Sequence, residues 1–484
     1  MSRREKISAV DTAWLRMDRP GNPMMICGVL LLRERVALER LKATIAERFL
    51  RFERFLDSPL ERAGIAFWQR ARDFDLAAHV VAIRLPARAG KRELEVLASR
   101  LAGTPLDPSR PLWQFHLVER YDGGSAVIVR IHHCYADGIA LVQVMLSMTD
   151  AAAAGPPAMP PPKARASNAR EPDLFGWLSQ PLGDALKVAG KVGGILIEKG
   201  VALWQDPAKA VELAHEGSAL TREIATLAMM GEDSPTRFKG IPGGTKRVAW
   251  AEPIPLDEIK TVGKALGASV NDVLLACVAG AMGRYLAAKG DALDQVMVRA
   301  LVPVNLRPLE KAYQLGNQFG LVFLALPIGI RNPIERLYAV RHNMQALKGS
   351  YQPVLALGLL AAMGAGPKLL QDKLLEALAR NATAVMTNVP GPQQALYIAG
   401  ARIDSLMFWV PQSGNIGMGA SIISFNGTVQ FGLITDRAIC PDPDEIVSGF
   451  AKEFETLVLT TLLSPWPWEG DLPPQVAEEA IAAR

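Results

Sequence analysis

The sequence predicts an α/β protein with two lobes, and three observations lead to this fold class. The chain has 484 residues, whereas one hydrophobic core rarely serves more than about 250–300 residues. Strand-like and helix-like segments alternate on both sides of a proline-rich break. Hydrophobic residues make up 49% of the chain and charged residues 21%, which excludes a largely disordered chain. We therefore expect a first lobe at residues 1–150, a crossover at 151–246 and a second lobe at 247–484.

Five segments define the expected first lobe. Residues 24–32 are almost continuously apolar and predict a buried strand, while residues 38–52 carry apolar residues at helical spacing. Residues 112–119 and 126–132 predict a pair of strands, because an Asp-Gly-Gly turn lies between them. An apolar helix is expected at residues 138–148.

The crossover and the second lobe differ in composition. Six prolines between residues 151 and 172 predict a linker or surface crossover, and residues 174–230 are helix-like. Residues 269–288 are expected to form a helix that starts with a capping box. Residues 405–435 contain no charged side chain but are broken by glycine and proline, so we expect them to form the buried sheet of the second lobe.

Charge and cysteine usage exclude several classes of protein. The 53 basic and 49 acidic side chains give a net charge of +4, which does not suggest a nucleic acid as partner. The four cysteines lie far apart, so neither a disulfide framework nor a zinc knuckle is indicated. Asp11 interrupts any apolar leader, and residues 354–366 are too short to span a bilayer. We expect a cytoplasmic protein that could still lie on a membrane surface.

The strongest local feature is the segment Ile131-His-His-Cys-Tyr-Ala-Asp-Gly138, between a predicted strand and a predicted helix. Side chains alternate along a strand, so His132 and His133 cannot point the same way if the strand persists. One histidine can therefore do chemistry while the other packs. Asp137 and Gly138 supply a turn and a helix N-cap.

Several chemistries fit this segment. A neutral imidazole can take the proton of an alcohol that attacks a carbonyl group. Asp137 could orient the imidazole, as the acid of a catalytic triad does, or pair with an arginine elsewhere. A metal site built from His132, Cys134 and Asp137 is possible in residue type, although no second cluster supports it. Cys134 could be a covalent nucleophile or a small core residue.

The pattern His132-His133-x-x-x-Asp137-Gly138 resembles the HHxxxDG motif of the chloramphenicol acetyltransferase-like superfamily. Within it, the chain is most similar to the bacterial wax ester synthase/acyl-CoA:diacylglycerol acyltransferase family across nearly its whole length. The motifs that carry this resemblance are Asp11-x-x-Trp14, Asn22-Pro-Met24, Pro111-Leu-Trp113, Asn271-Asp272, Val302-Pro-Val-Asn-Leu-Arg307, Gly316-Asn317-x-x-Gly320, Asn388-Val-Pro-Gly-Pro392 and Gly400-Ala-Arg402.

The resemblance implies two chloramphenicol acetyltransferase-like lobes, each a mixed sheet with helices, and an active-site channel between them. His133 would be the general base, and acyl-CoA and the alcohol would reach it from opposite sides in a ternary complex. Asp137 would point away from the channel and pair with an arginine, for which Arg307 is the candidate. No metal and no cofactor are implied, because acyl-CoA is a substrate.

Other residues of the matched motifs receive roles on the same basis. His132 and Gly138 belong to the catalytic motif. Asn271, Pro111 and Trp113 are candidates for substrate binding, and Asn388 for structural support. Asn271 also fits a capping box, and the turn that follows Asn388 is explained by its own chemistry.

Three functions follow as hypotheses. The first is an acyl-CoA-dependent O-acyltransferase that makes triacylglycerol from diacylglycerol, or wax ester from a long-chain alcohol. The second is a condensation-type transferase whose acyl donor is bound to a carrier protein, although the chain shows no carrier domain. The third is a non-catalytic protein that binds lipid inclusions, against which the intact histidine motif argues.

A lipid-synthesising enzyme must touch a lipid surface, and residues 184–230 are the expected contact. The segment mixes apolar residues and Trp204 with four lysines, a composition that suits an interfacial helix. The alternative is an ordinary amphipathic helix packed on the first lobe. The predicted location is therefore peripheral to a membrane or lipid droplet.

Overall fold

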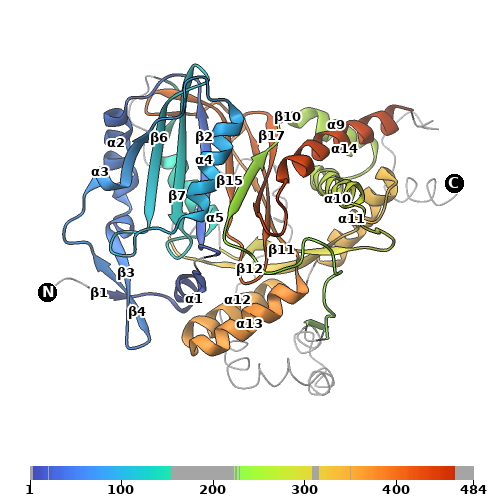
Figure 1. The fold of residues 1–484 in the computed structure, drawn as a ribbon, viewed down its shortest axis with the longest axis horizontal. Helices are drawn as coiled ribbons and strands as arrows, with labels where there is room; N and C mark the ends of the chain where they lie inside the picture. Colours follow the sequence, from blue (N-terminus) through green and yellow to red (C-terminus); the bar gives the residue numbers. More distant parts are fainter. Residues whose placement is uncertain are drawn as a thin grey trace.

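The computed structural model describes residues 4–153 and 223–463, apart from residues 20, 224–225, 228, 308–314 and 349. The α/β class predicted from the sequence is confirmed, because two large mixed sheets lie side by side with helices around them (Figure 1). Trp204 and most of the predicted lipid-contact segment lie outside the described residues, so that prediction stays open.

The first sheet has seven strands in the order β5-β6-β7-β2-β15-β14-β8. Its N-terminal strands agree with the prediction: β2 and β7 pair antiparallel over eight residue pairs, and the β6–β7 hairpin turns at Tyr121 and Gly124. The strands are β2 (Met25–Leu32), β5 (Val80–Ile83), β6 (Trp113–Tyr121), β7 (Gly124–His132), β8 (Thr149–Asp150), β14 (Tyr397–Ile398) and β15 (Ala401–Trp409).

Two of these strands come from the C-terminal half of the chain. β15 pairs antiparallel with β2, and β14 joins β15 to β8. The prediction that residues 405–435 belong wholly to the second lobe is therefore wrong for its first five residues, which complete the first sheet. The physical reason is that an uncharged strand is buried equally well in either sheet, so composition cannot assign it.

The second sheet has the order β10-β17-β16-β13-β11-β12, with β9 also paired to β17. The predicted hairpin at Asn426-Gly427 is confirmed, and both residues have positive φ angles, 48° and 77°, as a two-residue turn of this kind requires. The strands are β9 (Lys246–Trp250), β10 (Ile254–Pro255), β11 (Val298–Asn305), β12 (Phe319–Leu326), β13 (Ala384–Pro390), β16 (Met418–Phe425) and β17 (Thr428–Asp436).

Helices pack around and between the two large sheets (Figure 1). The predicted capping box of α10 is confirmed, because the Ser269 hydroxyl accepts from the Asp272 backbone and the Asp272 carboxylate accepts from Ser269. The helices are α1 (Ala9–Met17), α2 (Leu38–Glu47), α3 (Leu76–His79), α4 (Lys91–Gly103), α5 (Gly138–Ser147), α9 (Leu256–Ala265), α10 (Val270–Ala288), α11 (Pro333–Ala346), α12 (Gln352–Ala365), α13 (Lys368–Asn381) and α14 (Pro443–Leu463).

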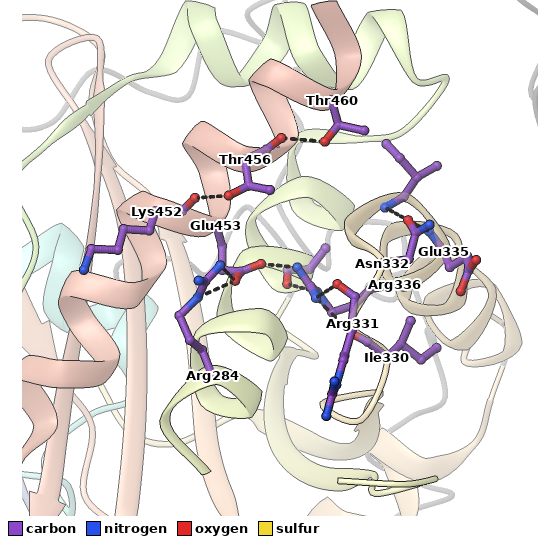
Figure 2. Close-up of polar contacts among 12 residues, drawn as sticks. Arg284, Ile330, Arg331, Asn332, Glu335, Arg336, Lys452, Glu453, Thr456 and Thr460 are labelled. Carbon is purple, nitrogen blue, oxygen red and sulfur yellow. Dashed lines mark hydrogen bonds and ion pairs between the residues drawn. The ribbon is translucent and has the colours of Figure 1, made fainter. Parts of the chain in front are cut away.

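A buried ion network joins three helices of the second lobe (Figure 2). Glu453 of α14 pairs with Arg336 of α11 and with Arg284 of α10. Arg336 also donates to the backbone carbonyls of Ala276, Ile330 and Arg331, so its polar atoms are satisfied inside the core. The network fixes the helical layer and lies within a single lobe.

The hydrophobic core is divided in the same way as the sheets. One cluster fills the first lobe and reaches α12, and another lies between the second sheet and its helices. A third contains residues of both sheets, including Cys27, Trp250 and Trp409, and therefore joins the lobes. Among the described helices, α10 alone is long and apolar enough to span a bilayer, and 83% of its most apolar window is buried inside the molecule.

Candidate active site

The histidine motif lies where the first sheet meets the second lobe. His132 is the last residue of β7, Asp137 is the N-cap of α5, and Gly138 is the first residue of that helix. The five residues between strand and helix, 133–137, form a buried turn. The His133 backbone N–H donates to the Met24 carbonyl at 2.8 Å, so the loop before β2 fixes the position of the second histidine.

Two aromatic rings enclose the His133 imidazole. Trp14 of α1 stacks on it with ring centroids 4.1 Å apart and an interplanar angle of 21°. Phe319 of β12 lies 5.7 Å away in a tilted orientation. The imidazole is thus held between a helix of the first lobe and a strand of the second.

Polar contacts hold the same histidine from the second lobe. The Asn317 side-chain amide donates to the His133 carbonyl at 2.9 Å and to Asp11 Oδ1 at 2.7 Å. The Asn317 backbone N–H also donates to Asp11 Oδ1, at 3.0 Å. This orientation of the amide leaves Asn317 Oδ1 and His133 Nδ1 as buried atoms without a hydrogen-bond partner.

His133 is a neutral base by virtue of its surroundings. Burial lowers its pKa to about 4, and its own backbone carbonyl and the Asn317 side chain act in the opposite direction. In the part of the chain that the structure describes, no carboxylate oxygen forms an ion pair with His133. Since buried histidines favour the uncharged form, the imidazole can accept a proton at neutral pH.

His132 makes contacts of a structural kind. Its Nδ1 accepts the Cys134 backbone N–H at 3.1 Å, and its Nε2 lies 3.9 Å from Asp18 Oδ2. Burial lowers its pKa to about 3. His132 and His133 therefore differ in their partners, but β7 ends at His132, so strand alternation does not extend to His133 and does not explain the difference.

Asp137 is turned toward an arginine of the second lobe. Its Oδ1 caps α5 by accepting from Ala140, and its Oδ2 accepts from Arg307 at 2.8 Å and from the Gln318 backbone at 3.0 Å. The ion pair expected between Asp137 and Arg307 is present, so of the two alternatives weighed for Asp137, the arginine partner is the one observed. Both side chains are almost completely buried, with exposed fractions of 5% and 1%.

Backbone contacts strengthen this junction. Gly316 donates to the Tyr135 carbonyl at 2.9 Å, and the Ala136–Gly316 pair forms a parallel bridge. Residues 316–318 are therefore clamped between Asp11 and Asp137 of the first lobe. The two lobes are joined at the motif itself.

An apolar cavity begins beside the motif. Ile131, Gly138 and Met145 line it from the first lobe. A second cavity continues it, since the two share five lining residues, Val142, Met145, Val389, Phe408 and Ile423. A Cβ added to Gly138 would meet no atom within 4 Å, so this glycine leaves the cavity open at the first residue of α5.

Another apolar cavity lies between β12, α12 and α13. Leu321 and Phe323 are among its lining residues. Alternation along the strand puts these two residues on the same face of β12 as Phe319, the residue that contacts the His133 ring.

The remaining predicted residues are placed as follows. Trp113 is completely buried, its indole donates to the Phe55 carbonyl at 2.7 Å, and its ring lies 4.3 Å from that of His79. Leu112, between Pro111 and Trp113, bonds to His132 and to the Tyr135 hydroxyl, so the segment braces the motif from behind. These are contacts of core residues, and the substrate-binding role of Pro111 and Trp113 stays a prediction.

Asn271 and Asn388 lie in the second lobe. Asn271 is buried in the first turn of α10. Asn388 lies on β13 between Thr387 and Val389, which both line the first cavity, so the pleat turns Asn388 to the other face of the sheet. The roles predicted for them are not tested by these contacts.

Cys134 is completely buried, and burial raises the pKa of its thiol well above the usual value. A thiol of this kind is a poor nucleophile, which favours the interpretation of Cys134 as a core residue. Within the described residues, no group of three or more histidine, cysteine, aspartate or glutamate side chains could hold a metal ion.

Sequence reasoning did not assign a role to Trp14, Asp11 or Asn317. Each belongs to a motif that was noted for its resemblance, but no periodicity links positions 11, 14 and 317 to position 133. The only available signal was that Asp11-x-x-Trp14 and Gly316-Asn317 occur together with the histidine motif.

Comparison with known proteins gives consistent results. The model of the wax ester synthase/diacylglycerol acyltransferase catalytic domain matches residues 7–274, and that of the WS/DGAT C-terminal domain matches residues 315–458. A Mycobacterium tuberculosis protein provisionally named as a diacylglycerol O-acyltransferase is 30% identical over 447 residues, covering 86% of this chain and 87% of its own. Another protein of that organism with the same kind of name is 27% identical over 487 residues, covering 94% of this chain and 90% of its own.

Solved structures share the fold. A wax ester synthase/diacylglycerol acyltransferase from Marinobacter aquaeolei VT8 superimposes with a TM-score of 0.66 at 21% identity, covering 95% of this chain and all of that one. The starter condensation domain of rhizomide synthetase gives a TM-score of 0.54 at 12% identity, covering 98% and 96% of the two chains. The predicted two-lobed chloramphenicol acetyltransferase-like architecture is thereby confirmed.

Proposed function

The chain belongs to the wax ester synthase/diacylglycerol acyltransferase family of O-acyltransferases, and from that premise we propose that it transfers a fatty acyl group from acyl-CoA to diacylglycerol or a long-chain alcohol. The observation that carries the proposal is the position of His133, a buried neutral imidazole in the turn between Ile131 and Gly138, which both line an apolar cavity between the lobes. The alternatives, a carrier-bound acyl donor and a non-catalytic lipid-binding protein, are outcomes of the test below.

His133 Nε2 is the proposed general base. Nδ1 is fully buried, so we assign the proton of the neutral ring to this nitrogen. The Nδ1–H tautomer leaves a lone pair on Nε2. In a catalytic triad, a carboxylate holds the histidine in the reactive tautomer. For His133 we propose that the burial of Nδ1 has this effect.

The reaction then needs one proton and no covalent enzyme intermediate. Nε2 takes the proton of the acceptor hydroxyl while the hydroxyl oxygen attacks the thioester carbonyl carbon. The carbon–sulfur bond breaks, and the imidazolium returns the proton to the departing CoA thiolate. Cys134 takes no part, since its sulfur is buried behind the motif.

The cavities support a lipid substrate. The paired cavity that starts at Ile131 and Gly138 is lined almost wholly by apolar side chains, and each methylene buried there contributes about 0.8 kcal/mol. We assign it to the donor acyl chain. The cavity between β12, α12 and α13 is assigned to an acyl or alkyl chain of the acceptor.

Asp137 and Arg307 are proposed to position the base. They hold residues 316–318 against the motif, and Asn317 in that segment contacts His133 directly. His132 supports the turn, Gly138 leaves room for substrate, and Asn271, Pro111 and Trp113 are retained as candidates for substrate binding. Association with a lipid surface through residues 184–230 belongs to the same proposal.

The test uses purified full-length protein with palmitoyl-CoA and either diacylglycerol or hexadecanol, followed by analysis of the product lipid. We expect triacylglycerol or wax ester, and a rate about 10²–10⁴-fold lower for His133→Ala. The matched control is His116→Ala, since His116 is a buried histidine on the neighbouring strand β6 without a hydrogen-bond partner for either nitrogen.

Four results would contradict parts of the proposal. Full turnover by His133→Ala would show that His133 is not the general base. Transfer from an acylated carrier protein but not from palmitoyl-CoA would show that the acyl donor is bound to a carrier protein and not to CoA. Lipid binding without turnover in the wild type would favour the non-catalytic alternative. A stable acyl adduct on Cys134 in the intact mass of protein incubated with palmitoyl-CoA would replace direct transfer by a two-step route.

A further inference from the structure

The base described above has an electrostatic problem. When His133 takes a proton it becomes an imidazolium in a buried site, and a buried charge is costly without a partner. In a catalytic triad a carboxylate supplies that partner. Here the motif carboxylate of Asp137 is already paired with Arg307, and no described carboxylate pairs with His133.

The nearest group with a suitable electrostatic character is the Trp14 ring. Its centroid lies 4.1 Å from that of the imidazole, and the planes differ by 21°. The face of an indole carries negative potential and attracts cations within about 6 Å. The stack therefore favours the protonated imidazole over the neutral one.

The indole N–H does not set Trp14 apart from the other core tryptophans. Its Nε1 is buried without a hydrogen-bond partner, and so are those of Trp68 and Trp409. What sets Trp14 apart is that its ring face stacks on the His133 imidazole.

The helix that carries Trp14 is firmly held. Asp11, one turn earlier, bonds to Asn317, and Arg16 donates to the carbonyls of Gly364 and Gly366. Gly364 of α12 has no room for a side chain, because an added Cβ would collide with the Ala9 carbonyl. The same helix therefore orients Asn317 and presents Trp14.

We propose that Trp14 is a positioning residue for His133, whose indole face stabilises the imidazolium that forms during transfer and prevents the ring from turning over. The exchange of Nδ1 and Nε2 is blocked because rotation of the imidazole would require the stacked indole to move. That the proton comes from the acceptor hydroxyl rests on the proposed function. The stabilisation of the protonated ring by Trp14 does not depend on that function.

The direct measurement is the pKa of His133 by NMR, with ¹³C-labelled histidine in the full chain. The protein has only six histidines, and His133→Ala assigns the signal. Trp14→Leu keeps apolar volume but removes the π face, so the pKa of His133 is expected to fall by roughly 0.4–1.5 units. Trp14→Phe should give a smaller fall.

The pH profile of the acyl transfer should move in the same direction. The acidic limb of kcat/KM shifts to lower pH in Trp14→Leu, and kcat falls by roughly 3–30-fold. The matched control is Trp250→Leu, since Trp250 is buried at 4% exposure and contacts Trp409 rather than His133. It should destabilise the protein without moving the His133 signal.

The ionisable groups around His133 stay in place in these variants. They are His132, Cys134, Asp11, Asp18, Asp137 and Arg307. If Trp14→Leu does not fold, fluorinated tryptophan in the wild-type chain weakens the π face at constant shape, and the pKa of His133 should fall with the degree of fluorination.

An unchanged or raised pKa of His133 in folded Trp14→Leu, or in the fluorinated protein, would overturn the proposal. That result is independent of substrate. A pKa that falls in a protein without acyl-transfer activity would instead support the role of Trp14 and contradict the proposed function.

Discussion

Two arginine–carboxylate pairs among the described residues are almost completely buried. Arg307–Asp137 lies at the junction of the two lobes, and Arg336–Glu453 lies among the helices of the second lobe. Arg307 and Asp137 are 1% and 5% exposed, and Arg336 and Glu453 are 5% and 6% exposed. Burial and chemistry are thus nearly equal. The surroundings differ: the first pair joins two lobes beside a cavity and orphaned polar atoms, and the second joins helices of a single lobe (Figure 2).

This difference teaches that a buried ion pair does not by itself mark a functional site. Desolvation offsets much of the attraction in either pair, so neither is strong support for stability. What distinguishes the Asp137–Arg307 pair is what it holds, namely residues 316–318 and, through Asn317, the backbone carbonyl of His133. The Arg336–Glu453 pair holds only other parts of the core.

The largest expected effect comes from removing the proposed base His133, and it distinguishes this residue from both ion pairs. His133→Ala should reduce turnover by about 10²–10⁴-fold, whereas its melting temperature should stay within a few degrees of wild type, since the imidazole makes no strong polar contact. Initial rates and differential scanning calorimetry measure the two quantities. A large loss of stability with little loss of rate would reverse the assignment.

Breaking each pair from the arginine side gives the sharpest form of the comparison. Arg307→Met leaves the buried Asp137 carboxylate without its ion-pair partner and should lower the free energy of unfolding by about 3–5 kcal/mol. Arg336→Met leaves Glu453 paired with Arg284 alone, so it should destabilise the protein by less. Only Arg307→Met should also reduce kcat per folded molecule, because residues 316–318 lose their anchor. Denaturant unfolding and rates at low temperature measure the two effects.

Arg62→Met is the control for that experiment, since Arg62 is an exposed arginine without an ion pair among the described residues. It should change neither quantity. Equal losses of kcat in Arg336→Met and Arg307→Met would mean that the two pairs do not differ in function.

Two glycines allow a smaller test. A Cβ on Gly280 would collide with Glu453 Oε2 and Arg336 Nη2, so Gly280→Ala should cost about 1–3 kcal/mol of unfolding free energy. A Cβ on Gly138 meets open space, so Gly138→Ala should change stability by less than about 1 kcal/mol. Equal destabilisation, measured by urea unfolding, would contradict the difference in packing.

The smallest expected effect comes from pH. His132 and His133 have pKa values lowered to about 3 and about 4 by burial, whereas in the unfolded chain they titrate near 6.5. The unfolded state binds the protons first, so stability falls as the pH falls from about 6.5 toward 4. From pH 7 to pH 6 each histidine should cost about 0.7 kcal/mol.

Urea unfolding at both pH values measures this effect, and the loss should be smaller in His132→Gln. The proposed base should stay neutral throughout this range, so kcat should not fall before the pH approaches about 4–5. A fall in kcat with an apparent pKa near 6.5 would show that His133 is not desolvated as described.

The sequence predicted the local part of the site well. The strand at residues 126–132, the turn and the helix at 138–148 follow from periodicity and from Asp137 as N-cap, and the structure agrees. Periodicity works here because neighbouring residues share one element. The partner of Asp137 came from the resemblance alone, because Arg307 lies 170 positions away along the chain.

Contacts between distant segments were not predicted for the same reason. Trp14 on His133 and Asn317 on Asp11 join positions with no common period. Trp113 was assigned to substrate from its motif, yet its ring packs in the first lobe. Residues 405–409 of β15 were predicted to lie in the second lobe, but they complete the first sheet. An uncharged strand can be buried equally well in either sheet.

The position of β15 has a consequence for the synthesis of the protein. β2 exposes a free hydrogen-bonding edge until residues 401–409, its partner strand, leave the ribosome. At about 5–20 residues per second the wait is roughly 20–75 s. An exposed apolar edge of this kind invites aggregation, so the nascent chain should depend on chaperones during this interval. A truncated chain that stops before β14 should be insoluble, and its solubility should return when a separate fragment carrying residues 391–463 is co-expressed.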